Sequence, residues 1–255
     1  METLCAYIRE NAPASSASDH DLGDWPEYPS PNLSFPRRRE SPANSQQDPR
    51  QHGDDQTEDH TPTTSDPAHD PTEVEPQTRS QKLAERHDKL NAWANTLPAP
   101  RVDIQAALTV IGRRSNELVE FERRQERPFA LDLRNTNLQS TDLRQSNLDH
   151  TLLNQARMEG AYLSEARMEG AKFHSADLKS AALSETFADA SVRAADLRSD
   201  QVSQEMLNNL FGDTATQLPD GLSMPDHWDD EAIEAWKTDP KFEAWLEQRR
   251  ASRTS

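Results

Sequence analysis

The residues best suited to metal chemistry gather in one short stretch of the sequence. They are His52, Asp54, Asp55, His60, His69 and Asp70. Imidazole and carboxylate groups can bind zinc, but zinc sites use short, fixed ligand spacings within a structural framework. This stretch instead lies among Pro, Ser, Thr and Gln residues without periodicity, which is typical of a solvated chain. We therefore expect no metal site and no cofactor.

Other groups capable of catalysis are scattered. Cys5 is the single cysteine and has no histidine near it in the sequence, whereas a cysteine nucleophile needs a neighbouring base. The sequence contains no phosphate-binding glycine loop, metal motif or dinucleotide-binding fingerprint. We therefore expect that the protein is not an enzyme. A single cysteine also excludes an intramolecular disulfide and fits a reducing compartment.

A five-residue repeat organises the centre of the chain. The stretch ARMEGAYLSEARMEGAKF, residues 156–173, contains ARMEGA twice, and each small residue is followed two positions later by a large apolar one. An α-helix would spread positions five apart around its whole circumference, and a flat strand would alternate their faces. The spacing predicts a chain that turns a corner every five residues, so that four sides close a square coil of about 20 residues.

The large positions of this repeat are predicted to line the axis of the coil. After residue 183 the spacing slips by one, and we favour continuation of the repeat over a loop in residues 184–200. In one version of this continuation, Phe187 turns inward and Glu185 takes the small position. In the other version, Thr186 and Ala188 take these inward positions, and the chain is shortened later. The predicted core residues are Leu133, Leu138, Leu143, Leu148, Leu153, Met158, Leu163, Met168, Phe173, Leu178, Leu183, Val192 and Leu197.

Several five-residue units resemble the pentapeptide repeat family, whose consensus is A(D/N)LXX. They include NTNLQ, STDLR, QSNLD, SADLK and AADLR. The resemblance implies an all-β solenoid, a right-handed quadrilateral β-helix of about three and a half coils over residues 129–200. VDIQAALTVIGRR resembles the segment before the repeats in a bacterial subfamily, and FGDTATQLPDGLSMPDHW resembles the segment that closes them. METLCAYIREN resembles another segment of that subfamily, whose members are membrane-anchored, so this chain resembles a shortened or soluble member.

Composition and pattern divide the remaining residues into flanking segments. Residues 11–80 hold eleven of the 17 prolines, which is typical of a disordered linker. The predicted segments are a short helical segment (1–12), a disordered linker rich in Pro, Asp and Ser (13–80), a helical N-terminal cap (81–128), a C-terminal capping segment (201–228) and a helical C-terminal extension (229–255).

A helix in the N-terminal cap is predicted from its apolar spacing. Ile104, Leu108 and Ile111 share one face of a helix over residues 101–114, and Leu118 and Phe121 could extend it. We expect this helix across the N-terminal mouth of the solenoid. The first coil would otherwise expose unpaired backbone groups and the end of the core.

The charge of the chain bears on its partners. The net charge is −17, but residues 129–200 carry 11 acidic and 8 basic side chains. Some members of the family bind DNA gyrase by mimicking DNA, so a DNA-mimic binder of gyrase or topoisomerase is the alternative function. Stacking residues 20 apart places Arg157 below Asp177 and Glu159 below Lys179, whereas a DNA mimic needs a continuous negative face. We therefore prefer a non-catalytic protein-interaction scaffold with an unidentified protein partner and no direct nucleic-acid binding.

Exposed apolar residues are the candidate contacts with that partner. Leu152 and Tyr162 are expected to point outward on different faces, so that neither face has a large apolar patch. In the C-terminal extension, the apolar residues either pack on the domain itself or form a docking surface; they are Trp236, Phe242, Trp245 and Leu246. The sequence has no apolar run long enough to span a membrane. We expect a bacterial, cytoplasmic protein.

Overall fold

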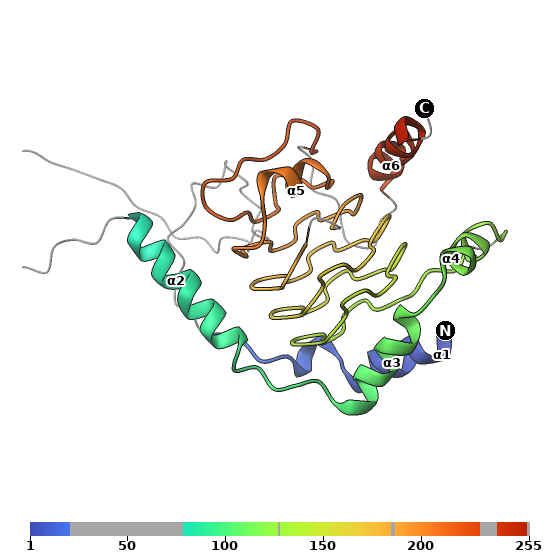
Figure 1. Cartoon of the computed structure of the whole chain (residues 1–255), viewed down its shortest axis with the longest axis horizontal. Coiled ribbons are helices and arrows are strands. Elements are labelled where there is room, and N and C mark those ends of the chain that lie inside the picture. The colour runs from blue at the N-terminus through green and yellow to red at the C-terminus, as the bar shows by residue number, and fades with distance from the viewer. Residues whose placement is uncertain (21–78, 127, 185–186, 230–238, 254–255) are drawn as a thin grey trace, which may run out of the picture. The chain divides into compact units, whose positions relative to one another are not determined.

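The computed structural model describes residues 1–20, 79–126, 128–184, 187–229 and 239–253. These residues belong to one compact unit of stacked coils flanked by helices (Figure 1). The helices are α1 (Glu2–Asn11), the short 3-10 helix η1 (Ala14–Ser16), α2 (Arg79–Ala94), α3 (Val102–Gly112), α4 (Asn116–Arg123), α5 (Gln204–Asn208) and α6 (Pro240–Arg253). Within the described ranges, no helix has the length and apolar character needed to cross a membrane.

The repeat segment forms coils that pair through parallel β-bridges. Four consecutive bridging positions, five residues apart, complete one coil before the next begins 20 residues later. The bridges between the first and second coils join Asp132 to Leu152, Asn137 to Arg157, Asp142 to Tyr162 and Asn147 to Arg167. Each side pairs through a single position, so the described repeat residues form isolated bridges rather than continuous strands. The predicted all-β solenoid is therefore observed only as stacked coils joined by β-bridges, without continuous strands in the described repeat residues.

The interior of the coils is filled by apolar side chains. Every large apolar position from Leu133 to Leu197 that the repeat predicts to face inward is at most 4% exposed. The small positions are also buried, and Thr136 and Thr141 satisfy their hydroxyl groups by donating to the carbonyl three residues earlier, at 2.6 and 2.7 Å. A solenoid filled in this way has no internal cleft.

Each corner of the coil is made by one residue with a positive φ. Gly160 and Gly170 adopt this conformation with φ of 66° and 72°, which costs glycine nothing sterically. The other described corners, between Asn135 and Ala194, use residues with side chains at φ of 52° to 61°. At Gly170 a side chain is excluded as well, because an added Cβ would lie 2.3 Å from His150 Nδ1.

The slip in the repeat shortens one coil by a residue. Bridges across it are 19 residues apart, as between Lys172 and Ser191. Phe187 is buried and packs edge-to-face on Phe173, with ring centroids 5.4 Å apart. The structure thus has the inward Phe187 of the first predicted version, while residues 185–186 lie outside the described residues.

α1 and α3 lie across the first coil and pack against each other (Figure 1). Ile8 comes from α1, and Ile104, Leu108 and Ile111 come from α3. All four are almost completely buried in the same apolar cluster as Leu133. The apolar face of α3 therefore covers the end of the core.

The cap also supplies hydrogen bonds that a preceding coil would have made. The Gln105 carboxamide donates from Nε2 to Asp142 O at 2.7 Å and accepts from Asp142 N at 3.0 Å, as a peptide group would. The other three sides are met as follows: Arg9 Nη1 donates to Asp132 O (2.6 Å), Asn137 N donates to Ala12 O (2.7 Å) and Asn147 N donates to Gly112 O (2.7 Å). All four sides of the first coil thus receive a partner from α1, from Ala12 at its end, or from α3.

Part of the predicted linker belongs to the folded unit. Pro13 forms an antiparallel bridge with Thr136, and the Ser18 backbone exchanges two hydrogen bonds of 2.8 Å with the Gln139 side chain. Composition alone assigned these residues to the linker because it does not show that a polar segment can pair with an open edge. The rest of the linker, residues 21–78, lies outside the described residues.

α4 is a separate helix rather than an extension of α3. α3 ends at Gly112, and Ser115 caps the start of α4, since its Oγ accepts from Leu118 N at 3.2 Å. Leu118 and Phe121 are consequently 38% and 64% exposed instead of buried with α3.

The C-terminal capping segment continues the stacking before it closes the solenoid. Ser191 pairs with Phe211 and Asp196 pairs with Gln217, so bridged coils extend past residue 200. Trp228 then covers the end, and its Nε1 donates to Leu210 O at 2.9 Å.

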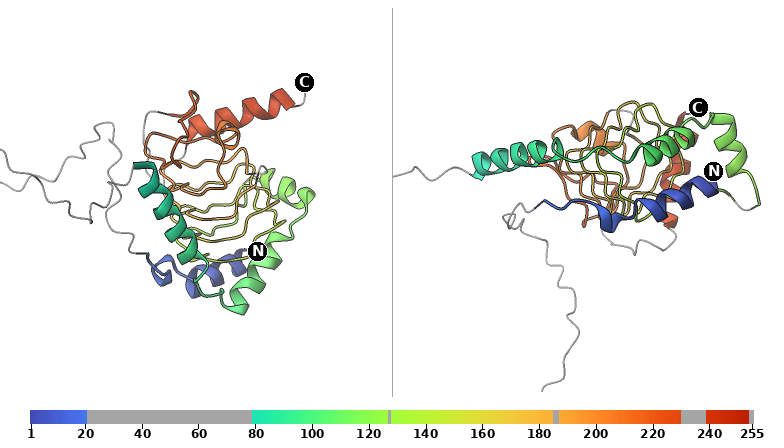
Figure 2. Two further views of the ribbon diagram at one scale, coloured as in Figure 1. Left: turned by 60° about the vertical axis from the view of Figure 1, so that its left-hand side comes forward. Right: turned by 90° about the horizontal axis from the view of Figure 1, so that it is seen from below.

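α2 runs beside the corners of successive coils (Figure 2). Ala94 lies against Gly160, where an added Cβ would be 3.3 Å from the Ala94 side chain. One turn earlier, Asn91 Oδ1 accepts from Ser180 Oγ at 2.7 Å. One helical turn rises about 5.4 Å and neighbouring coils lie about 4.8 Å apart, so successive turns can meet successive corners.

We expect Leu153→Lys to abolish cooperative folding, because it places an unpaired ammonium group in the apolar interior. The matched control is Leu152→Lys at the neighbouring half-buried, outward position, which should remain folded. Thermal unfolding followed by circular dichroism compares the two. A cooperative transition of Leu153→Lys near the wild-type temperature would contradict the inward assignment.

Replacing Gln105 with Met should lower the free energy of unfolding by about 1 kcal/mol, because both hydrogen bonds to Asp142 are lost while side-chain size is kept. Gln248→Met at an exposed position of α6 is the control and should change it by less than about 0.5 kcal/mol. Urea denaturation measures both. Equal effects would show that the Gln105 carboxamide does not act as an edge partner.

Candidate functional site

The groups first considered for chemistry do not form a reactive site in the described residues. Residues 52–70 lie outside them. Among those the structure does describe, no three His, Cys, Asp or Glu side chains are placed to hold a metal ion. Cys5 is buried, and that burial raises the pKa of its thiol, which disfavours the reactive thiolate.

The aromatic residues of the C-terminal extension pack on the domain. Phe242 and Leu246 are at most 1% exposed and cluster with Phe211. Trp245 packs beside them, with its ring 5.4 Å from that of Phe211. The docking surface considered for this extension therefore cannot include Phe242 or Leu246, because both are already buried within the domain. Trp236 lies outside the described residues.

Ion pairs also join α6 to the coils. Basic side chains near its C-terminus meet acidic residues at the corners of two coils, and a lysine of the solenoid reaches back to the helix. The pairs are Arg249 and Arg253 with Asp189, Arg250 with Glu169, and Lys172 with Glu243.

A buried arginine joins the last coils to the segment before α6. Arg193 is 1% exposed and lies 2.5 Å from Asp239, 2.8 Å from Asp229 and 3.8 Å from Asp213. Burial opposes its charge, but the hydrogen bonds that Arg193 donates to Asp239 and Asp229 outweigh burial and raise the pKa of Arg193. The protonated guanidinium thus serves as a fixed positive charge that joins these three carboxylates.

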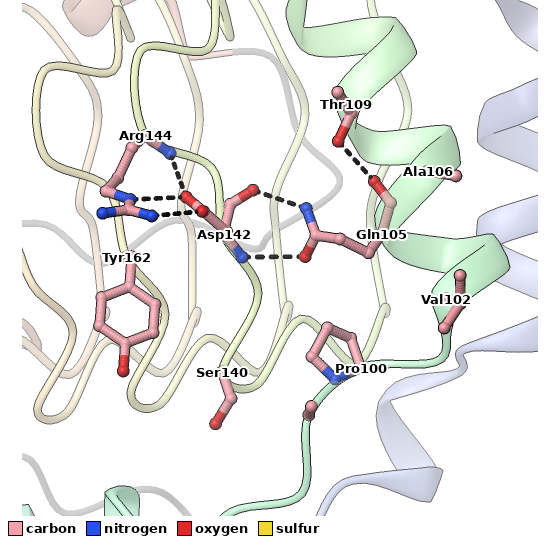
Figure 3. A pocket seen from close by; sticks show the side chains of 10 residues that line it. Pro100, Val102, Gln105, Ala106, Thr109, Ser140, Asp142, Arg144 and Tyr162 are labelled. Atoms are coloured by element: carbon pink, nitrogen blue, oxygen red, sulfur yellow. Dashed lines mark hydrogen bonds and ion pairs between the residues drawn. The ribbon is translucent and has the colours of Figure 1, made fainter.

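A groove lies between α3 and one side of the first two coils (Figure 3). Its volume is about 640 Å³. Two apolar side chains that line the groove are exposed to solvent: Val102 is 86% exposed and Tyr162 is 46% exposed. Six residues form its main walls: Pro100, Val102 and Ala106 on the cap, and Ser140, Arg144 and Tyr162 on the coils.

The polar floor of the groove is fixed by hydrogen bonds. Arg144 donates to both carboxylate oxygens of Asp142, at 2.9 and 2.6 Å, and Gln105 holds the Asp142 backbone from the other side (Figure 3). The hydrogen bonds from Arg144 lower the pKa of Asp142. The Arg144 guanidinium also lies 5.9 Å from the centre of the Tyr162 ring. This pre-ordered, charge-balanced floor is suited to recognition of a partner.

The wall of the groove continues onto an exposed apolar stripe of α3. Val102, Ala106 and Val110 follow one another at intervals of four and are all exposed. α3 is therefore apolar on its outer face as well as on its buried face. The sequence carried this signal, because a helix that is apolar all round is normally buried on all sides. Tyr162 was expected on a face without a large apolar patch, and it lines the groove together with Val102 and Ala106 of α3.

A second surface carries charges of both signs. Arg157 pairs with Glu159 at 2.5 Å and with Asp19 of the N-terminal arm at 2.8 Å. One coil further on, Lys179 pairs with Asp177 at 2.8 Å. The bridge between Arg157 and Asp177 places them in the same column, as the repeat predicts. This side therefore has no continuous negative stripe.

The two ARMEGA copies hold their glutamates in different environments. Glu159 is fully buried, and its Oε2 has no hydrogen-bond partner. Burial and the nearby Asp177 raise the pKa of Glu159 to about 7, against the opposing effect of Arg157. Burial also opposes ionisation of Glu169, but the hydrogen bond and charge of Arg250 outweigh it and lower that pKa.

Comparison with protein families identifies the repeat segment. Residues 132–170 and 152–187 match the model described as pentapeptide repeats, with eight copies. Among curated proteins, none matches the chain.

Solved structures similar to this chain are also pentapeptide repeat proteins. One from the cyanobacterium Cyanothece 51142 is 23% identical, covers 43% of this chain and 70% of its own, and has a TM-score of 0.17. Another from Nostoc Pcc 7120 is 24% identical over 36% of this chain and 77% of its own, with a TM-score of 0.14. A third, from the thylakoid lumen of Arabidopsis thaliana, is 22% identical over 36% of this chain and 54% of its own, with a TM-score of 0.10.

We expect Glu159→Gln to remove a pH dependence of stability. Because the folded pKa of about 7 exceeds the ordinary glutamate value of about 4.3, protonated Glu159 stabilises the fold fully below about pH 4.3, and this contribution is lost as the pH rises through about 7. The variant should therefore be more stable than the wild type at pH 8 and similar to it at pH 4, as measured by urea denaturation.

The control for this prediction is Glu169→Gln in the other ARMEGA copy. Its folded pKa is lowered, so its contribution is present above the ordinary glutamate pKa, and the variant should be less stable at pH 8. If Glu159→Gln also lost stability at pH 8, the ion pair with Arg157 would outweigh burial and the assignment would be wrong.

Proposed function

We propose that this pentapeptide repeat protein, whose residues 132–187 match the family, is a non-catalytic scaffold that binds another protein. Its filled interior leaves no cleft for a substrate, and the described residues hold no metal-binding group. Neither observation alone identifies a function. The positive support is a surface that is open, apolar and pre-ordered.

The observation that carries the proposal is the groove beside α3. Exposed apolar residues that stand singly are ordinary, but contiguous ones next to a fixed polar floor are typical of interaction sites. Val102 and Tyr162 line the groove from the cap and from the coils, and the pair formed by Asp142 and Arg144 lines it as well. A partner could bury the apolar walls while its polar groups meet this pair.

We also propose the family's right-handed quadrilateral β-helix for these coils, in a bacterial cytoplasmic protein. The four bridges per coil support the quadrilateral form, and the resemblance supports the hand and the setting. A solenoid of this kind is a rigid support, because each coil contacts only its neighbours through a continuous core. Rigid walls lower the entropic cost of binding a partner.

A DNA-mimic role is the less favoured alternative. Mimicry needs negative charge that continues over several coils. On the side bearing Arg157, basic and acidic groups alternate, as in the pairs of Asp177 with Lys179 and Asp196 with Arg198. On the groove side, Arg144 balances Asp142. These neutralised columns favour protein recognition without mimicry of phosphates.

A photo-crosslinking amino acid at position 162 should capture a discrete heterologous protein in the native cells. The matched control places it at position 167, which is exposed on the next side of the same coil. Mass spectrometry identifies the adducts. Adducts that form equally from both positions, or none from position 162, would overturn the groove as the binding site.

A supercoiling assay with purified DNA gyrase separates the scaffold from the mimic. We expect neither inhibition of gyrase nor protection from quinolones at micromolar protein. Inhibition that persists when Tyr162 is replaced by Ala would favour the mimic over the scaffold.

A further inference from the structure

The N-terminal arm, residues 13–20, lies along the edge of the first coil and is held there by few contacts. Ala14 N donates to Asn135 O at 2.8 Å, and the Ser18 backbone exchanges two hydrogen bonds of 2.8 Å with the Gln139 carboxamide. None of residues 13–20, all of which the structure describes, is buried. A segment without buried apolar contacts opens at a low cost in free energy, so a change in one contact can shift its docking.

One charged contact joins the end of this arm to the second coil. Arg157 Nη1 donates to Asp19 Oδ1 at 2.8 Å, and the Asp19 side chain is 84% exposed. The same guanidinium donates to Glu159 Oε1 from Nε at 2.8 Å and from Nη2 at 2.5 Å. Arg157 is therefore shared by two carboxylates, one in the arm and one in the coil.

The carboxylate in the coil lies in surroundings that oppose its charge. The Glu159 side chain is completely buried, and its Oε2 has no hydrogen-bond partner. The charged groups that act on it are Arg157, which favours the ionised form, and Asp177, which opposes it. Asp177 is itself paired with Lys179 at 2.8 Å. An unpartnered buried oxygen and a nearby negative charge both favour the neutral acid, so Glu159 can change its charge near neutral pH.

The other elements packed nearby bring one further titratable group. α2 and the turn after it reach the neighbouring corner at Gly160 with the uncharged side chains of Ala94 and Leu97. His20, at the end of the arm, packs edge-to-face on Trp93 of α2, with ring centroids 5.0 Å apart. Because histidine is a pH-sensitive side chain, a test of pH dependence must separate its effect from that of the glutamate.

We propose that the N-terminal arm is a pH-sensitive strap, which docks on the coils more tightly when Glu159 is neutral than when it is ionised. A neutral Glu159 leaves the charge of Arg157 to Asp19, whereas an ionised Glu159 offsets that charge and repels Asp19. The strength of exposed ion pairs corresponds to a change of about two- to fivefold in the docking equilibrium. The arm therefore loosens as the pH rises through about 7, where Glu159 ionises.

The coupling between the arm and the glutamate acts in both directions. Since neutral Glu159 favours docking, the docked arm favours protonation of Glu159 by the same factor. Removing the charge of Asp19 should therefore lower the pKa of Glu159 from its value of about 7. A two- to fivefold coupling corresponds to a decrease of about 0.3 to 0.7 in that pKa.

Solvent-exchange NMR of the Ser18 amide measures docking of the arm, when exchange is expressed as protection relative to an unfolded peptide. In the wild type we expect protection to be about two- to fivefold lower at pH 8 than at pH 6. Glu159→Gln should show the same protection at both pH values. Glu169→Gln, the matched change in the other ARMEGA copy, and His20→Gln, in the arm itself, should both keep the wild-type pH dependence.

Carbon-13 NMR titration of the Glu159 carboxyl carbon measures the reciprocal effect, and its signal is assigned by its absence from Glu159→Gln. Asp19→Asn should lower the pKa of Glu159, whereas Asp226→Asn, at an exposed position of the C-terminal capping segment, should leave it unchanged. An equal pKa of Glu159 in Asp19→Asn and the wild type would overturn the strap. So would a pH dependence of Ser18 protection that persists in Glu159→Gln.

Discussion

The coil has room for one large apolar side chain on each five-residue side, and this constraint governs the rest of the molecule. Leu, Met and Phe side chains occupy the axis from Leu133 to Leu197, and a corner with positive φ follows each described side within the regular run. These side chains are buried in one continuous apolar cluster. Any binding surface must therefore lie on the outer sides of the coils or on the segments that close their ends.

Closing the ends links the fold to the proposed function. Stacked coils leave unpaired backbone groups at both ends, and α3 meets this need with Gln105 and Gly112 while its apolar face covers the core. Placing α3 there also brings Val102 beside the coil that carries Tyr162. The groove and the exposed stripe of α3 are thus consequences of how the first coil is capped.

The local spacing of residues in the sequence makes much of the fold predictable. Where the structure differs from the prediction, contacts between residues far apart in the sequence are the cause. The inward positions follow from a fixed interval of five, and the one-residue slip before Phe187 was visible as a broken interval. The docking of Phe242 on Phe211 was not, because nothing near either residue in the sequence specifies the other. The groove was missed for the same reason. The two ARMEGA copies make the point most clearly, since Glu159 and Glu169 have opposite pKa shifts within the same hexapeptide.

Native-state hydrogen exchange tests most directly whether the first coil is closed by its cap. We expect the edge amides of the first coil to exchange within about tenfold of the equivalent amides one coil later, because each has a partner. The amides to compare are those of Asn137, Asp142 and Asn147 with those of Arg157, Tyr162 and Arg167. Exchange of the first three at the rate of an unfolded chain, with the last three protected, would contradict it.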